Sequence, residues 1–224
     1  MGRFYNPSTV TEGLILYFDA ANPKSYPGTG TTWYDLSGNG NNGSMVNGVG
    51  YDTTNKGSMV FDGINDYVTV TNNVPSGLND FAVSTWVYKT EITANRYIFD
   101  FGSNGGCLAS TASGNFRYYN GTTGISSSLY TSGPLCLINT WFNIVISRIS
   151  GVTYFYSNSE LITSATDIGN IGSWGTTLTI GNYGGGSSYY LQGYLPNILV
   201  YKNKGLSAVE VKQNFYANRV RYGI

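Results

Sequence analysis

The sequence predicts an all-β protein, a two-sheet antiparallel sandwich with one short C-terminal helix. Short runs rich in Val, Phe, Tyr and Thr, bounded by Gly, Asn, Ser or Pro, recur along the chain at spacings typical of a sandwich. Three of these runs fall between residues 57 and 88, and the convincing helix signal comes after Ser207. With 224 residues and 41% hydrophobic composition, the chain is long and apolar enough to fold without a metal or a disulfide.

The N-terminal part contains one buried strand and one long polar segment. Residues 1–12 form a polar lead-in, and residues 13–224 are expected to form a single domain. Residues 13–19 are almost continuously apolar, which indicates a strand buried on both faces. Residues 20–55 are rich in Gly, Asn, Ser, Thr and Pro around one apolar island, Trp33 to Leu36. A segment this long is expected either to be functional or to cover one face of the sheet.

Residues 57–70 supply the first two strands of the central block. The apolar runs 59–61 and 67–70 flank Asp62 and Gly63, a turn signal of the hairpin type. Five residues separate the two runs, so the predicted hairpin has a loop longer than two residues.

Residues 81–88 predict an internal strand. Phe81, Val83 and Val87 fall on one face, and Trp86 and Tyr88 fall on the other. Because successive side chains point to opposite faces, bulky residues on both faces indicate a strand covered on both sides.

Further strand candidates follow the central block. Tyr97, Phe99 and Phe101 alternate in the first of them, as expected for one face of a strand. Pro196 lies in the last one and should occupy an end or a bulge, because proline donates no hydrogen bond. The candidates are residues 96–102, 116–119, 141–148, 152–157, 178–181 and 193–202.

The predicted helix begins at Ser207. Ser207 and Glu210 have the spacing of a capping box, and Leu206 with Val211 fits a hydrophobic staple. Val211 and Phe215 then share a face at helical spacing, which should pack on the sandwich.

Composition excludes several kinds of partner. Lys plus Arg and Asp plus Glu number 12 each, so the net charge of zero offers no basic surface to nucleic acid or an anionic membrane. No run of about 18 apolar residues predicts membrane insertion. No apolar core follows Met1, so no signal peptide is expected.

Histidine is absent, which removes the commonest general base and the commonest metal ligand. Cys107 and Cys136 are too few for a disulfide scaffold or a zinc site. Both have apolar neighbours, so they are expected to be buried free thiols, or to form a bridge if their strands adjoin.

Several segments, taken in order, resemble the laminin G-like, concanavalin A-like lectin/glucanase superfamily. They are residues 13–20, 35–43, 60–68, 81–87, 141–147, 193–201 and 206–211. The resemblance implies two antiparallel sheets of six or seven strands in a jelly roll whose concave face and edge loops bind glycans. Asn158-Ser159 departs from the family's usual Asn-Gly hairpin. The segment Asp35-Leu-Ser-Gly-Asn-Gly-Asn looks most similar to virion structural proteins of tailed phages, especially marine ones.

The resemblance also gives a test for catalysis. The glucanase branch places two glutamates about four residues apart on one strand, where acid and nucleophile share a cleft. The glutamates of this chain are far apart, at Glu12, Glu91, Glu160 and Glu210. We therefore expect no enzymatic activity.

Calcium is the one cofactor that the sequence suggests. Asp62, Asn65 and Asp66 place two carboxylates and an amide on a tight loop, where they can converge on a hard cation. The alternative is that Asp62 and Asp66 bond to amides of their own turn. Asp35 begins a segment similar to the opening of an EF-hand loop, but Val46 stands where the bidentate glutamate belongs, so a solvated turn is favoured.

Glycan binding requires aromatic platforms beside amides and hydroxyls. The 20 tyrosines, with abundant Gly, Ser and Asn, provide the composition that antibody loops use. Trp86 and Trp141 lie in strands and are expected to be core residues. The predicted platforms, expected on loops, are Trp33, Tyr34, Trp174, Tyr183, Tyr189 and Tyr190.

Two functions remain in view. The first is a non-enzymatic phage virion protein, assembled in the host cytoplasm and displayed on the virion surface as a capsid decoration, fibre or tail-associated module. Its partners would be other virion proteins, cell-surface glycans and further copies in a homo-oligomer. The second is a free lectin, or a carbohydrate-binding module of a secreted enzyme or adhesin.

Overall fold

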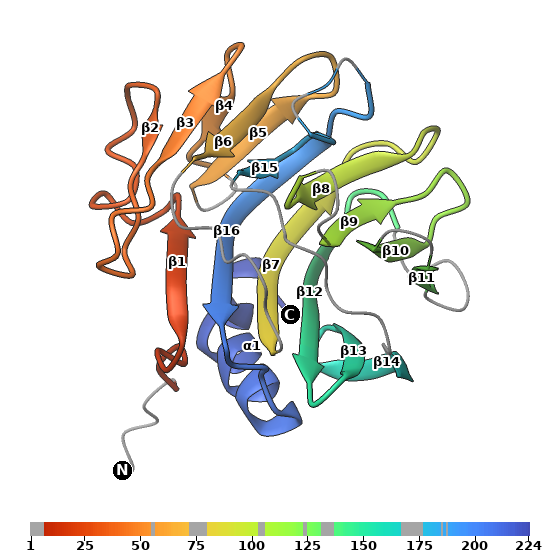
Figure 1. The fold of residues 1–224 in the computed structure, drawn as a ribbon. Coiled ribbons are helices and arrows are strands. Elements are labelled where there is room, and N and C mark those ends of the chain that lie inside the picture. The colour runs from red at the N-terminus through yellow and green to blue at the C-terminus, as the bar shows by residue number, and fades with distance from the viewer. Residues whose placement is uncertain are drawn as a thin grey trace.

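The computed structural model describes residues 7–54, 57–71, 80–102, 106–122, 125–130, 137–166, 177–184, 186 and 188–224. Its strands form two antiparallel sheets of eight strands each, with one helix outside them (Figure 1). The predicted all-β sandwich with a short C-terminal helix is confirmed. Each sheet has more strands than the six or seven that the family resemblance implied, because residues 20–55 supply three short strands.

The first sheet, sheet A, has the strand order β14-β13-β12-β7-β16-β5-β4, and β1 also pairs with β16. Its strands are β1 (Leu14–Asp19), β4 (Gly50–Asp52), β5 (Ser58–Asp62), β7 (Phe81–Lys89), β12 (Trp141–Ile149), β13 (Val152–Ser157), β14 (Glu160–Thr166) and β16 (Gln192–Lys202).

The second sheet, sheet B, has the strand order β11-β10-β9-β8-β15-β6-β3-β2. Its strands are β2 (Thr32–Trp33), β3 (Gly43–Val46), β6 (Tyr67–Val70), β8 (Arg96–Asp100), β9 (Gly106–Ser110), β10 (Phe116–Thr122), β11 (Ile125–Tyr130) and β15 (Leu178–Ile180).

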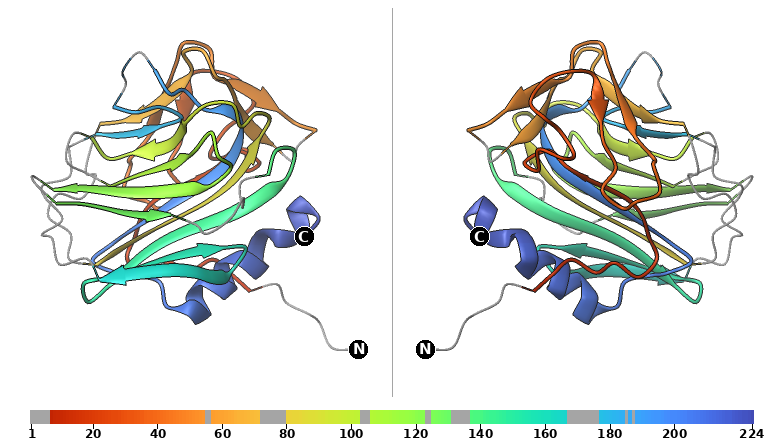
Figure 2. Two further views of the ribbon diagram at one scale, coloured as in Figure 1. Left: turned by 90° about the vertical axis from the view of Figure 1, so that its right-hand side faces the viewer. Right: turned by 90° about the vertical axis from the view of Figure 1, so that its left-hand side faces the viewer.

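The central strands of sheet A, β7, β12 and β16, are buried on both faces. From β7, Phe81, Val83 and Val87 join the main core between the sheets. Trp86, on the opposite face of β7, packs instead against Phe215 of α1 (Ala208–Tyr222). Figure 2 shows α1 against the outer side of sheet A. The two-sided burial predicted for residues 81–88 is therefore correct.

The helix begins as predicted. Ser207 is the N-cap, and its Oγ accepts a hydrogen bond from the Glu210 backbone at 3.4 Å while the Glu210 carboxylate accepts one from the Ser207 backbone at 2.8 Å. Gly223 ends the helix with φ 74°, a conformation that glycine adopts without strain. Within the described residues, no helix is long and apolar enough to cross a membrane.

β1 and β16 are antiparallel neighbours, which joins the two apolar runs near opposite ends of the chain. The pairing of β16 with β7 shifts register between Tyr194 and Asn197, so Pro196 lies at a bulge, as predicted. The Pro196 carbonyl accepts a hydrogen bond from the Ala20 backbone at 2.8 Å, which fixes the chain as it leaves β1.

The predicted hairpin of residues 59–70 is wrong. β5 pairs with β4 and β16 in sheet A, whereas β6 pairs with β3 and β15 in sheet B. The turn at Asp62 and Gly63 therefore carries the chain from one sheet to the other. The Asp66 carboxylate accepts a hydrogen bond from the Asp62 backbone at 3.1 Å and connects the two strand ends.

Residues 35–41, the edge loop, cover the edge of β1 that faces away from β16. The Asp35 carboxylate accepts hydrogen bonds from the backbone amides of Tyr17 at 2.9 Å, Ser37 at 2.8 Å and Asn41 at 3.0 Å. The Ile15 carbonyl accepts from Ser37 Oγ at 2.9 Å and from Asn41 Nδ2 at 2.7 Å. Side chains thus do for β1 what a neighbouring strand would do, since buried backbone groups need partners.

The hairpin between β13 and β14 turns at Asn158 and Ser159. Their φ values are 49° and 70°, so both adopt the left-handed conformation of a two-residue turn. The Asn158 side chain accepts a hydrogen bond from the Asn143 backbone at 2.9 Å, which helps to hold this turn without glycine.

Candidate functional site

The candidate site lies on the outer face of sheet B. β10 alternates strictly: Phe116 and Tyr118 are in the core, while Arg117 and Tyr119 are only partly buried. The Arg117 guanidinium lies over the Tyr119 ring, 5.2 Å from its centroid, a distance at which a cation and an aromatic face attract each other.

Strand register adds Tyr97 to this face. Arg117 pairs with Ala109 of β9, and Ala109 pairs with Tyr97 of β8, so the three side chains share one side of the sheet. The register shifts between Tyr97 and Phe99, which leaves Phe99 and Phe101 in the core. The predicted alternation of these aromatics on a single face is therefore wrong, and the bulge is the reason.

The loop after β15 places two more tyrosines beside Tyr97. The ring centroid of Tyr97 lies 4.8 Å from that of Tyr183 and 5.7 Å from that of Tyr189. Tyr183 is 46% exposed and Tyr189 is 47% exposed. A cavity of about 250 Å³ is lined by Tyr97, Arg117, Tyr119 and Tyr183. We call these four residues and Tyr189 the tyrosine site.

Internal hydrogen bonds hold this loop in place. Asn182 is fully buried; its Nδ2 donates to the Gly186 carbonyl at 2.9 Å, and its Oδ1 accepts from the Tyr183 backbone at 2.6 Å. The Tyr190 hydroxyl also donates to the Gly186 carbonyl. Tyr97 donates its backbone N–H to the Tyr189 carbonyl at 3.0 Å, which ties the loop to β8. The tyrosines are thus preorganised, and the Tyr190 hydroxyl supports the loop.

Two buried titratable groups, Asp100 and Cys107, lie close to the tyrosines of the site. Burial raises the pKa of Asp100 to about 6, although backbone amides of Gly102 and Gly184 donate to its carboxylate. Burial, reinforced by the charge of Asp100, raises the pKa of the Cys107 thiol to about 12. Cys107 is a buried free cysteine, as one of the two alternatives predicted, whereas Cys136 lies outside the described residues. A thiol with this pKa is no nucleophile at neutral pH.

Glu12, Glu91 and Glu210 form ion pairs with described lysine and arginine side chains. Arg96 Nε lies 2.6 Å from the Glu91 carboxylate, and Lys204 Nζ lies 2.7 Å from Glu210 and 3.6 Å from Glu12. Burial alone would raise the pKa of Glu210, but hydrogen bonds from Lys204 and Ser207 outweigh it, and the pKa is lowered. A general acid needs a raised pKa instead.

The other predicted glycan residues lie elsewhere. Trp33 is not loop-borne as expected: it belongs to β2, is fully buried and stacks on Phe18 with ring centroids 4.7 Å apart. Tyr34 is 45% exposed, but β15, β6 and β3 separate its neighbouring strand β2 from β8. Trp174 lies outside the described residues. The sequence missed Tyr97, Arg117 and Tyr119, and the only sequence signal for the last two was their alternation with Phe116 and Tyr118.

The predicted calcium ligands make turn hydrogen bonds. Asp62 Oδ1 accepts from the backbone amides of Ile64 at 2.7 Å and Asn65 at 3.3 Å. Asp66 is 4% exposed; burial raises its pKa, partly offset by the hydrogen bond from Asp62. Each carboxylate keeps one oxygen outside these bonds. Among the residues that the structure describes, no three His, Cys, Asp or Glu side chains group as metal ligands.

The fold is a lectin-like β-sandwich that carries a cluster of tyrosines on the outer face of sheet B. Residues 62–212, about two thirds of the chain, match the family described as the concanavalin A-like lectin/glucanases superfamily. The chain belongs to this superfamily, which confirms the resemblance and the jelly-roll expectation. No curated protein matches the sequence.

Several solved structures have the same fold at low sequence identity. Domain 4 of AbnA, an extracellular arabinanase from Geobacillus stearothermophilus solved in complex with arabinotriose, is 16% identical with a TM-score of 0.69, and the match covers 91% of this chain and 98% of that one. The binding domain of botulinum neurotoxin serotype D is 17% identical with a TM-score of 0.72, at 94% and 52% coverage. The binding domain of Paraclostridial Mosquitocidal Protein 1 is 18% identical with a TM-score of 0.73, at 92% and 52% coverage. The chain thus spans about half the length of these toxin domains.

Proposed function

We propose that this protein is a non-enzymatic glycan-binding module that holds its ligand at the tyrosine site. The observation that carries this proposal is the meeting of three tyrosine rings, Tyr97, Tyr183 and Tyr189, beside a cavity of about 250 Å³. Tyrosine offers a sugar a rigid apolar face and a hydroxyl at little entropic cost. Arg117 adds charged hydrogen-bond donors at the same cavity.

Two further facts support glycan binding. Domain 4 of AbnA, which has the same fold over nearly its whole length, was solved with arabinotriose bound. The loop that carries Tyr183 and Tyr189 is fixed by its own hydrogen bonds, so less conformational entropy is lost when a ligand binds.

The test is binding to an array of immobilised oligosaccharides that includes arabinotriose, followed by calorimetry with the best ligand. We expect Tyr183→Ala to weaken binding at least tenfold, as for an aromatic hot spot, and to leave stability within about 1 kcal/mol because the side chain is half exposed. Tyr34→Ala, at matched exposure far from the site, should leave affinity unchanged. Wild-type protein that binds no glycan, or a Tyr183→Ala variant that binds as tightly, would refute the proposal.

We further propose that the module is carried on a phage particle, at the virion surface, where other virion proteins hold it and copies of it associate. The support is the similarity of residues 35–41 to virion proteins, together with a surface poor in charge. The alternative, a free lectin or the carbohydrate-binding part of a secreted enzyme or adhesin, is supported by AbnA, an extracellular enzyme with a domain of this fold. Immunogold electron microscopy distinguishes the two: labelled particles support the virion, and protein found only free in the medium supports the alternative.

A further inference from the structure

Residues 7–10, which we call the arm, precede β1 and lie beside α1 (Figure 2). The Val10 N–H donates to Asn214 Oδ1 at 2.8 Å, and the Val10 carbonyl accepts from the Tyr201 hydroxyl at 2.9 Å. Asn214 Nδ2 donates in turn to the Tyr201 hydroxyl at 3.0 Å, which joins these two side chains. Gln213 Nε2 donates to a second backbone carbonyl of the arm at 2.7 Å. The arm is therefore held largely through its backbone, as a peptide is when it is added to a strand edge.

The groups that hold the arm form a buried receptor. Tyr201 of β16 is fully buried, and Asn214 of α1 is 3% exposed. Val10 is 8% exposed and lies in an apolar cluster with Leu206 and Val211. Among the described residues, Asn214 Oδ1 accepts only from Val10, so an empty receptor would leave a buried acceptor unsatisfied, which is costly. We call Tyr201, Asn214 and this cluster the arm receptor. It fits an extended backbone that carries one aliphatic side chain.

A short turn, Thr11 to Gly13, joins the arm to β1. Thr11 and Glu12 are exposed, and the Leu14 N–H donates to the Thr11 carbonyl at 3.2 Å. Glu12 adds an exposed ion pair with Lys204 at 3.6 Å, and a pair of this kind contributes little. Straightening the turn would therefore break few contacts. A turn of this kind can act as a hinge at which an identical segment passes from one molecule to another.

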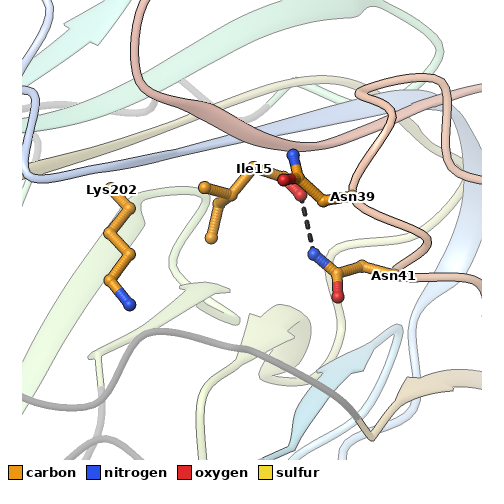
Figure 3. A pocket seen from close by; sticks show the side chains of 4 residues that line it. All are labelled: Ile15, Asn39, Asn41 and Lys202. Carbon is orange, nitrogen blue, oxygen red and sulfur yellow. Dashed lines mark hydrogen bonds between the residues drawn. The ribbon is translucent and has the colours of Figure 1, made fainter.

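Exchange of the arm would stop at β1, because both edges of that strand are held in its own molecule. One edge pairs with β16. On the other edge, Figure 3 shows the Asn41 side chain bonded to Ile15, whose carbonyl accepts from Asn41 Nδ2 at 2.7 Å. The arm can thus leave the fold without opening sheet A.

We propose that the arm receptor binds the arm of a second copy of this chain, so that copies are joined by exchange of arms. The exchanged arm makes the same bonds and buries the same Val10 side chain, because the two chains are identical. The tether keeps each molecule's own arm at an effective concentration on the order of millimolar. Exchange is therefore expected where copies are crowded, or where the hinge is too short to turn back.

This inference gives a surface to the association of copies proposed above. It does not depend on glycan binding, because the arm receptor shares no residue with the tyrosine site. Binding of arabinotriose by the same variants tests the tyrosine site separately.

The experiment shortens the hinge. A full chain that lacks only Thr11 and Glu12 cannot return its arm to its own receptor, so light scattering should show a dimer at a concentration where the wild-type chain is a monomer. Val10→Asp in the shortened chain should restore the monomer, because a charge then replaces the side chain that the receptor buries. Val209→Asp is the control: Val209 lies on α1 and is 75% exposed, so the dimer should persist.

A labelled peptide of residues 4–12 gives a second measurement. The full-length Val10→Asp chain leaves its receptor open, and the peptide should bind to it saturably. The same peptide with Val10→Asp should bind about tenfold or more weakly, since it lacks the buried aliphatic contact. If the Val10→Asp chain does not fold, Val10→Ser takes its place.

The outcomes separate clearly. A dimer that persists when Val10→Asp is added to the shortened chain uses another surface and refutes the proposal. A shortened chain that is folded and monomeric also refutes it. If the shortened chain does not fold, the peptide decides, and a peptide that fails to bind the open receptor refutes exchange. A wild-type dimer that Val10→Asp dissociates supports the proposal.

Discussion

Docking of α1 on sheet A should contribute far more to stability than its N-terminal cap does. Phe215 is 5% exposed, and its ring stacks on Trp86 with centroids 5.5 Å apart. Phe215→Ala should lower the free energy of unfolding by about 3–5 kcal/mol, since it removes a buried ring and leaves a cavity. Ser207→Ala removes only the cap, whose bonds lie at the surface, and should cost about 1 kcal/mol.

Urea unfolding followed by circular dichroism measures both changes. The slope with denaturant should stay constant, because neither substitution alters the surface exposed on unfolding. Tyr216→Ala is the control: Tyr216 is 43% exposed on the same helix, so its loss should cost about 1 kcal/mol or less. If Phe215→Ala costs no more than Ser207→Ala, α1 does not pack on the sandwich and the reasoning fails.

Three further predictions concern carboxylates. Asp35→Asn should destabilise the protein by about 2 kcal/mol or more, because three backbone amides donate hydrogen bonds to this carboxylate. Asp62→Asn is the control in the same urea titration. Its carboxylate bonds only within its own turn, so the substitution should cost about 1 kcal/mol or less. Burial raises the pKa of Asp100 in the folded state to about 6 from an ordinary 3.8, so the folded state binds this proton more tightly. The contribution of Asp100 to stability is therefore full below pH 4 and is lost as the pH rises through 6. Asp100→Asn should remove this contribution from the pH dependence of the unfolding free energy, and an unchanged pH dependence would contradict the shift. If calcium binds at Asp62 and Asp66, the melting temperature should be higher in millimolar calcium than in chelator. The Asp66→Asn variant should show no such difference. Identical melting curves of the wild-type protein in calcium and in chelator would mean that both side chains serve the turn alone.

The sequence was most informative where local pattern and burial agree. Val83 and Val87 alternate with Trp86, and both faces of β7 prove to be covered. The capping box at Ser207 and the bulge at Pro196 are local chemistry, and both appear as predicted.

The predictions that failed concern features that depend on contacts between segments far apart in the sequence. The turn at Asp62 has the same local chemistry whether β6 returns to sheet A or crosses to sheet B, and only the partners of β6 decide which. Trp33 sits in a Gly- and Asn-rich segment, yet it is buried because Phe18, from a distant strand, stacks on it. The tyrosine site depends on register across β8, β9 and β10, which no local pattern contains.

The edge loop also limits how copies of this protein can associate. An open strand edge serves as a template on which another chain can add a strand. On β1 that edge is closed, because Leu14, Ile15 and Tyr17 already bond to side chains of the loop. Among the described strands, sheet A ends at β14 and β4. A continuous sheet between two molecules would therefore have to begin at one of those ends. The asparagine-rich loop prevents another chain from pairing with β1.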